Sequence, residues 1–390
     1  MWGAATSSHQ IEGGNDNDWT RWENQGKIKN KEKSGKAANS WNLYKRDFDL
    51  LEKLNLNAYR FSIEWSRIEP EQGKFDQKAI DKYKAMIKDL KSRGITPIVT
   101  LHHFTNPKWL NAWTDKYNVN KFKAYVEKVV EEFGDDVKYW VTINEPGIFV
   151  SLGYQKDIWP PGFKNRRDAL RALRNIHQAH RAAYISIHQI YKENEWNKPM
   201  VSMAFNMQYF EPVGNSILNK IATKMSDYFV NRYSYNKVKS YLDYIGLNYY
   251  FSHKVNIRKL KSITELDEGG FKKSDLGWDM NPDGLYGVLL SLKKKKLPVI
   301  ITENGLADAR DINREWFIKE HLKAVARAMH EGVNVKGYMH WSLIDNFEWA
   351  DGFGPRFGLA EVDYKKFKRT PRKSSSTYAK IAKTNSLEIK

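Results

Sequence analysis

The chain of 390 residues contains no cysteine. Without thiols it can form neither disulfides nor a thiolate metal site, and a cysteine nucleophile is excluded as well. Such a composition fits a reducing cytoplasm, which is the location we predict. Long apolar runs are lacking too, because no uninterrupted apolar stretch approaches 18 residues and no basic-then-apolar leader precedes Trp2. We therefore expect a soluble protein with neither signal peptide nor membrane span.

Acidic residues are fewer than basic ones, with 46 Asp and Glu against 64 Lys and Arg, for a formal net charge of +18. This excess raises the question of an acidic partner such as nucleic acid or a membrane surface. The densest basic runs are Lys293 to Lys296, at the end of a predicted helix, and Lys365 to Lys373. No nucleic-acid-binding motif is recognisable. We predict a solvated basic surface with no specific nucleic-acid or membrane partner, and an acidic partner is the alternative.

Two segments share one form, an apolar β-rich run that ends in a glutamate and a breaker. They are Val299-Ile300-Ile301-Thr302-Glu303-Asn304-Gly305 and Lys138-Tyr139-Trp140-Val141-Thr142-Ile143-Asn144-Glu145-Pro146. Short continuous apolar runs predict strands buried on both faces, and we expect Asn304-Gly305 to turn the backbone sharply. One such glutamate would be interpreted as a surface residue at a strand end. Two of them indicate a pair of carboxylates, each at the end of a strand.

These two segments resemble the catalytic signatures of the family 1 glycoside hydrolases, the family of retaining β-glucosidases and β-galactosidases. The resemblance spans nearly the whole chain. Any one motif could arise by chance, but their occurrence together in the family's order is highly specific. The further motifs are Trp2 to Gly13, Tyr59 to Arg67, Leu101 to Phe104, Gly246 to Tyr250, Gly277 to Tyr286 and His340 to Trp349.

Apolar β-type runs alternate along the chain with segments of helical period, which predicts a parallel sheet wrapped by helices. Eight such units predict an α/β fold, a single (β/α)8 barrel over residues 1–390. The helical stripes include Trp41, Tyr44, Phe48 and Leu51; Phe122, Val126, Val129 and Phe133; and Ile318, Leu322, Val325 and Met329. The expected strands are Trp2 to Ser8, Ala58 to Trp65, Thr96 to His103, Tyr139 to Asn144, Met200 to Met207, Tyr244 to Tyr250, Val299 to Glu303 and Lys336 to Ser342.

Catalytic residues of such barrels gather at the C-terminal ends of the strands. Long loops are expected over Gly147 to Lys164 and Ser252 to Asp283, where they would shape the aglycone side of the site. The candidate residues at predicted strand ends are Glu145, Glu303, His103, Asn144, Tyr250 and Trp341.

By resemblance, Glu303 is the nucleophile and Glu145 the acid/base of a retaining mechanism, which requires the two carboxyl groups to lie roughly 5 to 5.5 Å apart. Arg60 matches a position whose permanent positive charge keeps Glu303 ionised, and Tyr250 can donate a hydrogen bond to it. Glu145 must hold its proton near neutral pH, and the negative charge of Glu303 raises its pKa. Once Glu303 is glycosylated, Glu145 becomes more acidic and can act as a base.

The resemblance also assigns the sugar contacts. Asn144 matches the residue that binds the 2-hydroxyl, and Trp341 matches the ring beneath the sugar. Glu348 stands where members that act on unmodified sugars carry Glu, and its carboxylate would repel a phosphate, so 6-phospho sugars are disfavoured. An aromatic content of 14% suits sugar stacking, although most of these rings are packing residues. Gln10, His103 and Trp349 match positions that bind the 3- and 4-hydroxyls.

The sequence departs from the family's usual pattern at several positions, and the chain is shorter than most members. Phe104 replaces a Trp, which removes an indole donor near the 3-hydroxyl, and Thr105 and Asn106 replace an acidic-apolar pair. Glu64 stands where many members carry Ser, and no role follows for it. His102 and His103 form no metal-ligand set, so we predict neither metal nor cofactor.

The sequence favours a retaining exo-β-glycosidase for β-glucosides, with β-galactosides or β-fucosides as further substrates. The partner is then a small-molecule β-glycoside or oligosaccharide. A catalytically weak or inactive sugar-binding protein of the same fold is the alternative, and the presence of both Glu145 and Glu303 argues against it. The ranking of glucose, galactose, fucose and mannose stays open, as does the oligomeric state.

Overall fold

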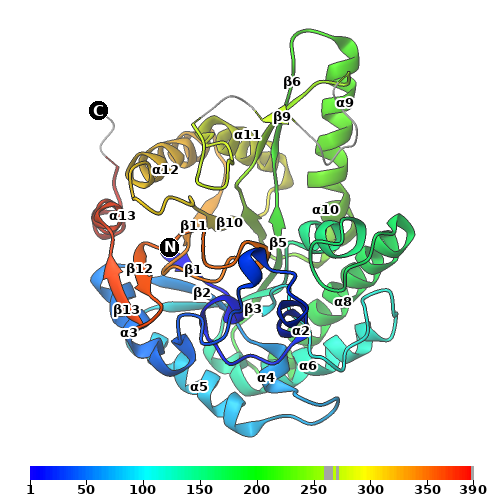
Figure 1. Cartoon of the computed structure of the whole chain (residues 1–390), viewed down its shortest axis with the longest axis vertical. Coiled ribbons are helices and arrows are strands. Elements are labelled where there is room, and N and C mark those ends of the chain that lie inside the picture. Colours follow the sequence, from blue (N-terminus) through cyan, green and yellow to red (C-terminus); the bar gives the residue numbers. More distant parts are fainter. Residues whose placement is uncertain (259–266, 269–271, 388–390) are drawn as a thin grey trace.

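A closed barrel of eight parallel strands forms the centre of the computed structural model, which describes residues 1–258, 267–268 and 272–387 (Figure 1). The hydrogen-bonded order around it is β1-β11-β10-β7-β5-β4-β3-β2. The first and last strands close it, because Ala5 of β1 pairs with Arg60 of β2 and with Trp341 of β11. The predicted (β/α)8 barrel is confirmed. Its strands are β1 (Trp2–Ala5), β2 (Ala58–Ser62), β3 (Thr96–His102), β4 (Tyr139–Asn144), β5 (Met200–Asn206), β7 (Ile245–Asn248), β10 (Val299–Asn304) and β11 (Val335–Trp341).

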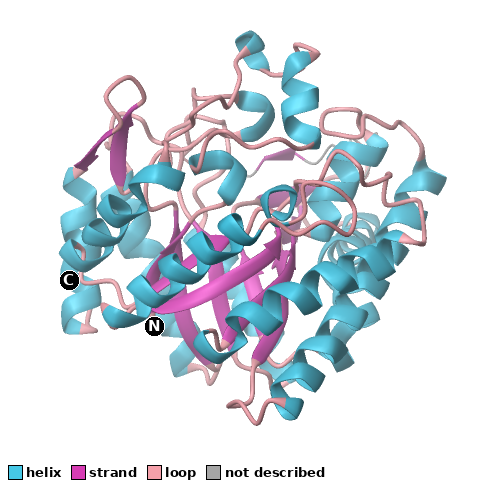
Figure 2. Ribbon diagram, turned by 90° about the horizontal axis from the view of Figure 1, so that it is seen from below, coloured by secondary structure: helices cyan, strands magenta, loops and turns pink. Residues whose placement is uncertain are grey.

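Helices enclose the barrel on its outside (Figure 2). Within the described ranges, none is long and apolar enough to cross a membrane. The α-helices are α1 (Ser8–Ile11), α2 (Asp18–Asn24), α3 (Ser40–Lys53), α4 (Trp65–Ile68), α5 (Gln77–Ser92), α6 (Asn118–Phe133), α7 (Pro146–Val150), α8 (Arg166–Glu193), α9 (Ile217–Asp227), α10 (Tyr233–Val238), α11 (Pro282–Leu292), α12 (Arg314–His330) and α13 (Lys373–Thr384). The short 3-10 and π segments are η1 (Lys29–Lys31), η2 (Gly134–Asp136), η3 (Ser151–Gln155), η4 (Tyr228–Arg232), η5 (Lys239–Tyr241), η6 (Lys293–Lys295) and η7 (Trp349–Asp351).

The helical stripes predicted from spacing lie on the inward faces of these helices, although Trp41 and Tyr44 of α3 are only partly buried and Met329 of α12 is exposed. All four stripe residues of α6 are buried, as the 4, 3, 4 spacing requires of one helix face. In α12 the prediction for Met329 was wrong, because this side of the last turn faces solvent and Met329 is exposed. Polar residues cap the starts of some helices: the Asp76 carboxylate accepts hydrogen bonds from two backbone amides at the start of α5, and Asn281 caps α11.

Six strands end earlier than predicted, and short helices take over on the barrel rim after two of them, β1 and β2. β1 ends at Ala5, so Ser8 begins α1, and β2 ends at Ser62, so Trp65 begins α4. The side chain of Trp65 is nonetheless fully buried, stacked on Tyr125 of α6. A short apolar run that is buried throughout reads the same as a strand or as one helical turn, which is why periodicity failed at this boundary.

Asn304 and Gly305 do not form the sharp turn that the Asn-Gly pair predicted. β10 continues through Asn304, whose buried side chain donates to the Tyr249 carbonyl and accepts from the Tyr338 hydroxyl. At Gly305 a side chain is excluded by contact, since a Cβ atom there would lie 1.7 Å from the carbonyl oxygen of Trp341. The glycine permits the close approach of two chain segments.

The segments after the strands are more structured than the loop predictions implied. Residues 147–164 include most of α7 and all of η3, and Pro146 occupies the first turn of α7. In the expected loop Ser252 to Asp283, β8 (Ser252–Val255) and β9 (Asp267–Glu268) form a three-stranded sheet with β6 (Tyr209–Pro212), while residues 259–266 and 269–271 lie outside the described residues. The sequence did not predict the excursion from β6 through α10 that separates β5 from β7.

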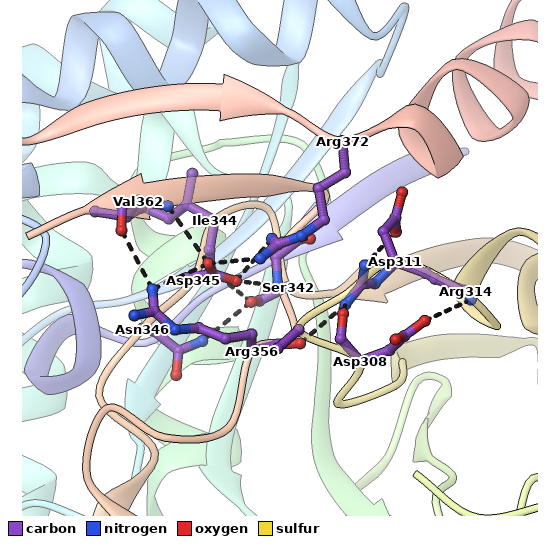
Figure 3. Close-up of polar contacts among 12 residues, drawn as sticks. Asp308, Asp311, Arg314, Ser342, Ile344, Asp345, Asn346, Arg356, Val362 and Arg372 are labelled. Carbon is purple, nitrogen blue, oxygen red and sulfur yellow. Dashed lines mark hydrogen bonds and ion pairs between the residues drawn. The ribbon is translucent and has the colours of Figure 1, made fainter. Parts of the chain in front are cut away.

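A buried network of carboxylates and guanidinium groups anchors the loop that follows β11 (Figure 3). The carboxylate of Asp345 accepts two hydrogen bonds of 2.9 Å from Arg372 and one of 3.2 Å from Arg356. The antiparallel hairpin of β12 (Ala360–Asp363) and β13 (Lys368–Pro371) holds these partners in place, and Arg369 pairs with the buried Asp47. Both arginines of the basic run 365–373 therefore neutralise buried carboxylates.

Replacing Arg372 with methionine should lower the free energy of unfolding by about 3–5 kcal/mol, because it leaves the buried Asp345 carboxylate short of its bidentate partner. Urea unfolding followed by tryptophan fluorescence measures this loss. Lys366→Met is the matched control, since Lys366 is exposed in the same hairpin. Equal midpoints for the two variants would contradict the assignment of Arg372 as the partner on which Asp345 depends.

Candidate active site

Glu145 and Glu303 lie at the C-terminal ends of β4 and β10, where the sequence placed them, and β5 and β7 separate these two strands in the barrel. Glu303 belongs to β10, paired with Asn248 of β7. Glu145 directly follows β4, and its backbone amide still donates to the Ala204 carbonyl of β5. Both glutamates are buried, with exposed fractions of 4% for Glu303 and 6% for Glu145. The fold thus carries two carboxyl groups into the same water-poor end of the barrel.

Glu303 is held by a cation and a hydroxyl. The guanidinium of Arg60, which is fully buried in β2, lies 2.5 Å from one carboxylate oxygen. The other oxygen accepts a 2.9 Å hydrogen bond from the hydroxyl of Tyr250. Arg60 is itself fixed by the Thr100 hydroxyl and by the Asn144 side chain, so its charge cannot turn away from Glu303. Both contacts favour the ionised carboxylate.

Glu145 receives neutral donors instead of a cation. One of its oxygens accepts hydrogen bonds from the amides of Asn248, at 2.7 Å, and Asn206, at 3.2 Å. Burial raises the pKa of Glu145 to about 8, and the charge of Glu303 adds to the rise. Burial also raises the pKa of Glu303, against the opposing effect of Arg60 and Tyr250. Because the cation contacts Glu303 and only amides contact Glu145, a proton shared between the two carboxyl groups resides on Glu145.

Asn144 and His103 adjoin this pair. The Asn144 side-chain oxygen accepts from Arg60 at 2.7 Å, and its nitrogen lies 3.3 Å from the Nε2 atom of His103. Burial lowers the pKa of His103 well below its ordinary value, and the Arg60 charge lowers it further, so the ring is neutral. A neutral ring and an amide tip are suited to hydrogen bonding with uncharged hydroxyl groups.

An aromatic and polar wall faces His103. The imidazole ring of His103 lies near-parallel to the ring of Trp341, at 5.9 Å between centroids, and to that of Trp349, at 6.1 Å. The Gln10 amide donates to Glu348 at 3.2 Å and to Asn346 at 2.9 Å. Burial and the charge of Asp351 raise the pKa of Glu348 well above its usual value. Hydrogen bonds and ring contacts join seven of the ten sequence-predicted residues directly: Arg60, His103, Asn144, Tyr250, Glu303, Trp341 and Trp349. Asn248 connects Glu145 to this set, because its amide donates to both Asn144 and Glu145. Gln10 and Glu348 are hydrogen-bonded to each other, and Glu348 directly precedes Trp349 in the chain.

The sequence model of Glycosyl hydrolase family 1 matches residues 1–238 and 229–387, and so nearly the full length of the chain. The chain belongs to glycosyl hydrolase family 1. Beta-glucosidase A of Thermotoga maritima is 33% identical over an alignment of 440 positions, which covers 100% of this chain and 98% of that protein. A beta-galactosidase of Pyrococcus woesei is 30% identical, covering 100% of this chain and 97% of the relative.

Solved structures agree with this family 1 assignment. The beta-glycosidase from Pyrococcus horikoshii superposes with a TM-score of 0.92 at 38% identity, covering 99% of this chain and 94% of the other. The beta-glucosidase from Thermotoga maritima in complex with glucoimidazole has a TM-score of 0.92 at 32% identity, with 99% and 98% covered. The protein is therefore a glycoside hydrolase with the activity of a β-glycosidase.

Two contacts of the family 1 site escaped the sequence analysis. Asn206 and Asn248 end strands β5 and β7 and supply both side-chain donors to Glu145. Asn248 also accepts from the Thr302 hydroxyl, which ties it to β10. Their position was the available signal, since a polar residue at the C-terminal end of a predicted barrel strand points toward the site.

Glu64 has a structural place in the fold. Its buried carboxylate accepts hydrogen bonds from the hydroxyls of Ser8, Ser66 and Thr105 and from the amide of Asn17. These donors come from segments that follow β1, β2 and β3, so one carboxylate joins three neighbouring rim segments. Thr105 and its neighbour Asn106, which depart from the family pattern, are both hydrogen-bonded within this rim.

Proposed function

We propose that this family 1 enzyme is a retaining exo-β-glycosidase that hydrolyses non-phosphorylated β-D-glucosides, with β-galactosides and β-fucosides as further substrates. The observation that supports the assignment best is the unequal environment of the two carboxyl groups. Glu303 faces the Arg60 cation and the Tyr250 hydroxyl, while Glu145 faces only amides and has a raised pKa. One group suits a nucleophile, and the other suits a proton donor.

In the first half of the proposed reaction, a Glu303 oxygen attacks the anomeric carbon while the bond to the leaving oxygen breaks. Glu145 transfers its proton to that oxygen, and a glycosyl ester on Glu303 results. The ester carries no charge, so Glu145 loses the neighbouring negative charge that adds to the rise in its pKa. In the second half, water attacks the anomeric carbon, its proton passes to Glu145, and the Glu303 carboxylate departs. Two inversions leave the β configuration unchanged.

The proposed sugar contacts follow the wall of the site. Asn144 would bind the 2-hydroxyl, Gln10, His103 and Trp349 the 3- and 4-hydroxyls, and Glu348 the 4- and 6-hydroxyls, above the ring of Trp341. Release of nitrophenol from its β-glucoside, β-galactoside and β-fucoside tests the activity. A folded protein that binds these sugars in calorimetry without releasing nitrophenol would favour the alternative, an inactive sugar-binding protein. The cytoplasmic location stays a prediction.

Replacing Glu348 with serine should lower kcat/KM for a β-glucoside by roughly 5- to 150-fold, the equivalent of about 1–3 kcal/mol for the two hydrogen bonds that its carboxyl group would make to the 4- and 6-hydroxyls. The same change removes an acidic side chain from beside the sugar 6-position, so the ratio of kcat/KM for the unmodified over the 6-phosphorylated β-glucoside should become smaller. Both substrates are assayed in parallel. An unchanged ratio would contradict the specificity role of Glu348. The arginines of the basic run 365–373 are not expected to bind the phosphate, because Arg369 and Arg372 are already paired with Asp47 and Asp345.

A further inference from the structure

Helix α9 and the π segment η4 carry their large apolar side chains on the side that faces solvent. In Figure 1 this helix lies beside β6 and extends beyond the ring of barrel helices. Residues 217, 221, 225 and 229 follow each other at intervals of four and form one row along the helix. Val213 and Ile257, next to the helix, are exposed as well. The exposed fractions are 74% for Ile217, 59% for Leu218, 50% for Ile221, 50% for Met225, 45% for Tyr228 and 52% for Phe229.

The side of α9 that faces the protein is polar. Asn219 and Ser226 are its buried residues. The Asn219 amide donates to the Val213 carbonyl at 2.7 Å, and its oxygen accepts from the Ile257 backbone at 3.0 Å. These bonds fix the rotation of the helix on β6 and β8. The usual orientation of an amphipathic surface helix is therefore reversed, and a contiguous apolar face of this kind marks an interaction surface.

A row of basic residues borders the apolar face. Lys220 and Lys224 are exposed, each one position before an apolar residue of the row, so they lie along one edge of the face. Among the described residues, neither lysine forms an ion pair, whereas Asp227, the one acidic residue of α9, pairs with Arg232. The face thus combines exposed Ile, Leu, Met and Phe side chains with uncompensated positive charge.

We propose that the outer face of α9 and η4 docks on an anionic lipid surface, with its apolar row in the headgroup boundary and Lys220 and Lys224 on the lipid phosphates. An apolar face with a basic border is the pattern by which helices lie in the plane of a membrane. This surface interaction departs from the expectation, from sequence, of no membrane partner. It requires no membrane-spanning helix.

A second copy of the chain fits this face less well. Two copies related by a two-fold axis would bring the same face together, and with it two sets of uncompensated lysines. Each chain also carries a formal charge of +18. Like charges placed opposite each other disfavour such a pair, whereas an anionic lipid surface complements them.

Sedimentation of the full-length protein with vesicles tests the proposal. We expect binding to vesicles of 70% phosphatidylcholine and 30% phosphatidylserine, and at least tenfold weaker binding to phosphatidylcholine alone or in 0.5 M salt. The double variant Lys220→Ala/Lys224→Ala should bind the anionic vesicles roughly 25-fold less tightly, at about fivefold per lysine. Ile221→Ser/Met225→Ser should lose binding by at least tenfold.

Leu170→Ser/Met329→Ser is the matched control, because these two apolar residues are at least as exposed as Ile221 and Met225 but lie on α8 and α12. It should bind as the unaltered protein does, and all variants should hydrolyse a soluble β-glucoside at the original rate. Failure of the unaltered protein to bind anionic vesicles would overturn the proposal, as would equal binding by Ile221→Ser/Met225→Ser. The face would instead be assigned to a second copy of the chain if the unaltered protein bound no vesicles and was a dimer in light scattering, while Ile221→Ser/Met225→Ser was a monomer.

Discussion

Replacing Glu303 with glutamine should abolish hydrolysis of aryl β-glucosides, with kcat reduced by roughly 10⁴-fold or more, the scale of loss seen when a catalytic nucleophile is removed. The amide cannot attack the anomeric carbon, and no other carboxylate occupies its place between Arg60 and Tyr250. Because glutamine matches glutamate in size, the barrel should remain folded. The rate of nitrophenol release per enzyme and the near-ultraviolet circular dichroism measure the two effects.

A variant with a smaller side chain at position 303 should form a new product that can be detected. In Glu303→Ala, azide can enter the space of the lost carboxylate and attack the anomeric carbon while Glu145 protonates the leaving oxygen. The expected product is the α-glycosyl azide, because only one displacement occurs. A β-glycosyl azide, or a Glu303→Gln protein with near-normal turnover, would refute Glu303 as the nucleophile.

Replacing Glu145 with glutamine should reduce kcat by about 10²- to 10⁴-fold for glycosides with poor leaving groups, the usual contribution of a positioned general acid. Dinitrophenolate is a good leaving group that needs little protonation, so the rate of the glycosylation step for a dinitrophenyl glycoside should fall much less. The unaltered enzyme should also lose activity as the pH rises through about 8, where the raised pKa of Glu145 lets the acid ionise. That alkaline limb should vanish in Glu145→Gln.

The raised pKa of Glu145 predicts that activity is lost on the alkaline side of the pH profile. A carboxyl group with a raised pKa stays protonated, and therefore competent as an acid, up to about pH 8, and it loses that proton above this value. Profiles of kcat/KM from pH 4 to 10, with a protein stable over the range, measure the limb. If Glu145→Gln kept the same alkaline limb, the titrating group would be a different residue.

Much of the barrel and site followed from the sequence because both depend on local patterns. Strand β4 was predicted with its correct limits, since its apolar run ends at a polar residue and a proline. The contacts of Arg60 and Tyr250 with Glu303 followed from family motifs that occur at strand ends. In a closed parallel barrel, strand ends meet at one rim, so correct strands bring distant motifs together without any further information.

The remainder required spatial information. The positions of Asn206 and Asn248 near strand ends indicate only that they lie close to the site, and it is their side-chain directions that make them donors to Glu145. The four donors of Glu64 come from the three rim segments that follow β1, β2 and β3, and no spacing rule links these segments. For α9 the amphipathic spacing is present in the sequence, but spacing alone assigns the apolar side to the core. Which side faces solvent depends on the hydrogen bonds of Asn219.

The closure of the barrel by β1 sets the order in which the enzyme can become active during its synthesis. Gln10, near the start of the chain, contacts Glu348, near its end. A ribosome adds about 5–20 residues per second, so roughly twenty seconds to a minute separate the appearance of these two residues. Throughout that time β1 lacks its neighbour β11, and the nascent chain presents an open sheet edge. Until the last strand emerges, this edge needs protection from other chains, and no sugar site exists.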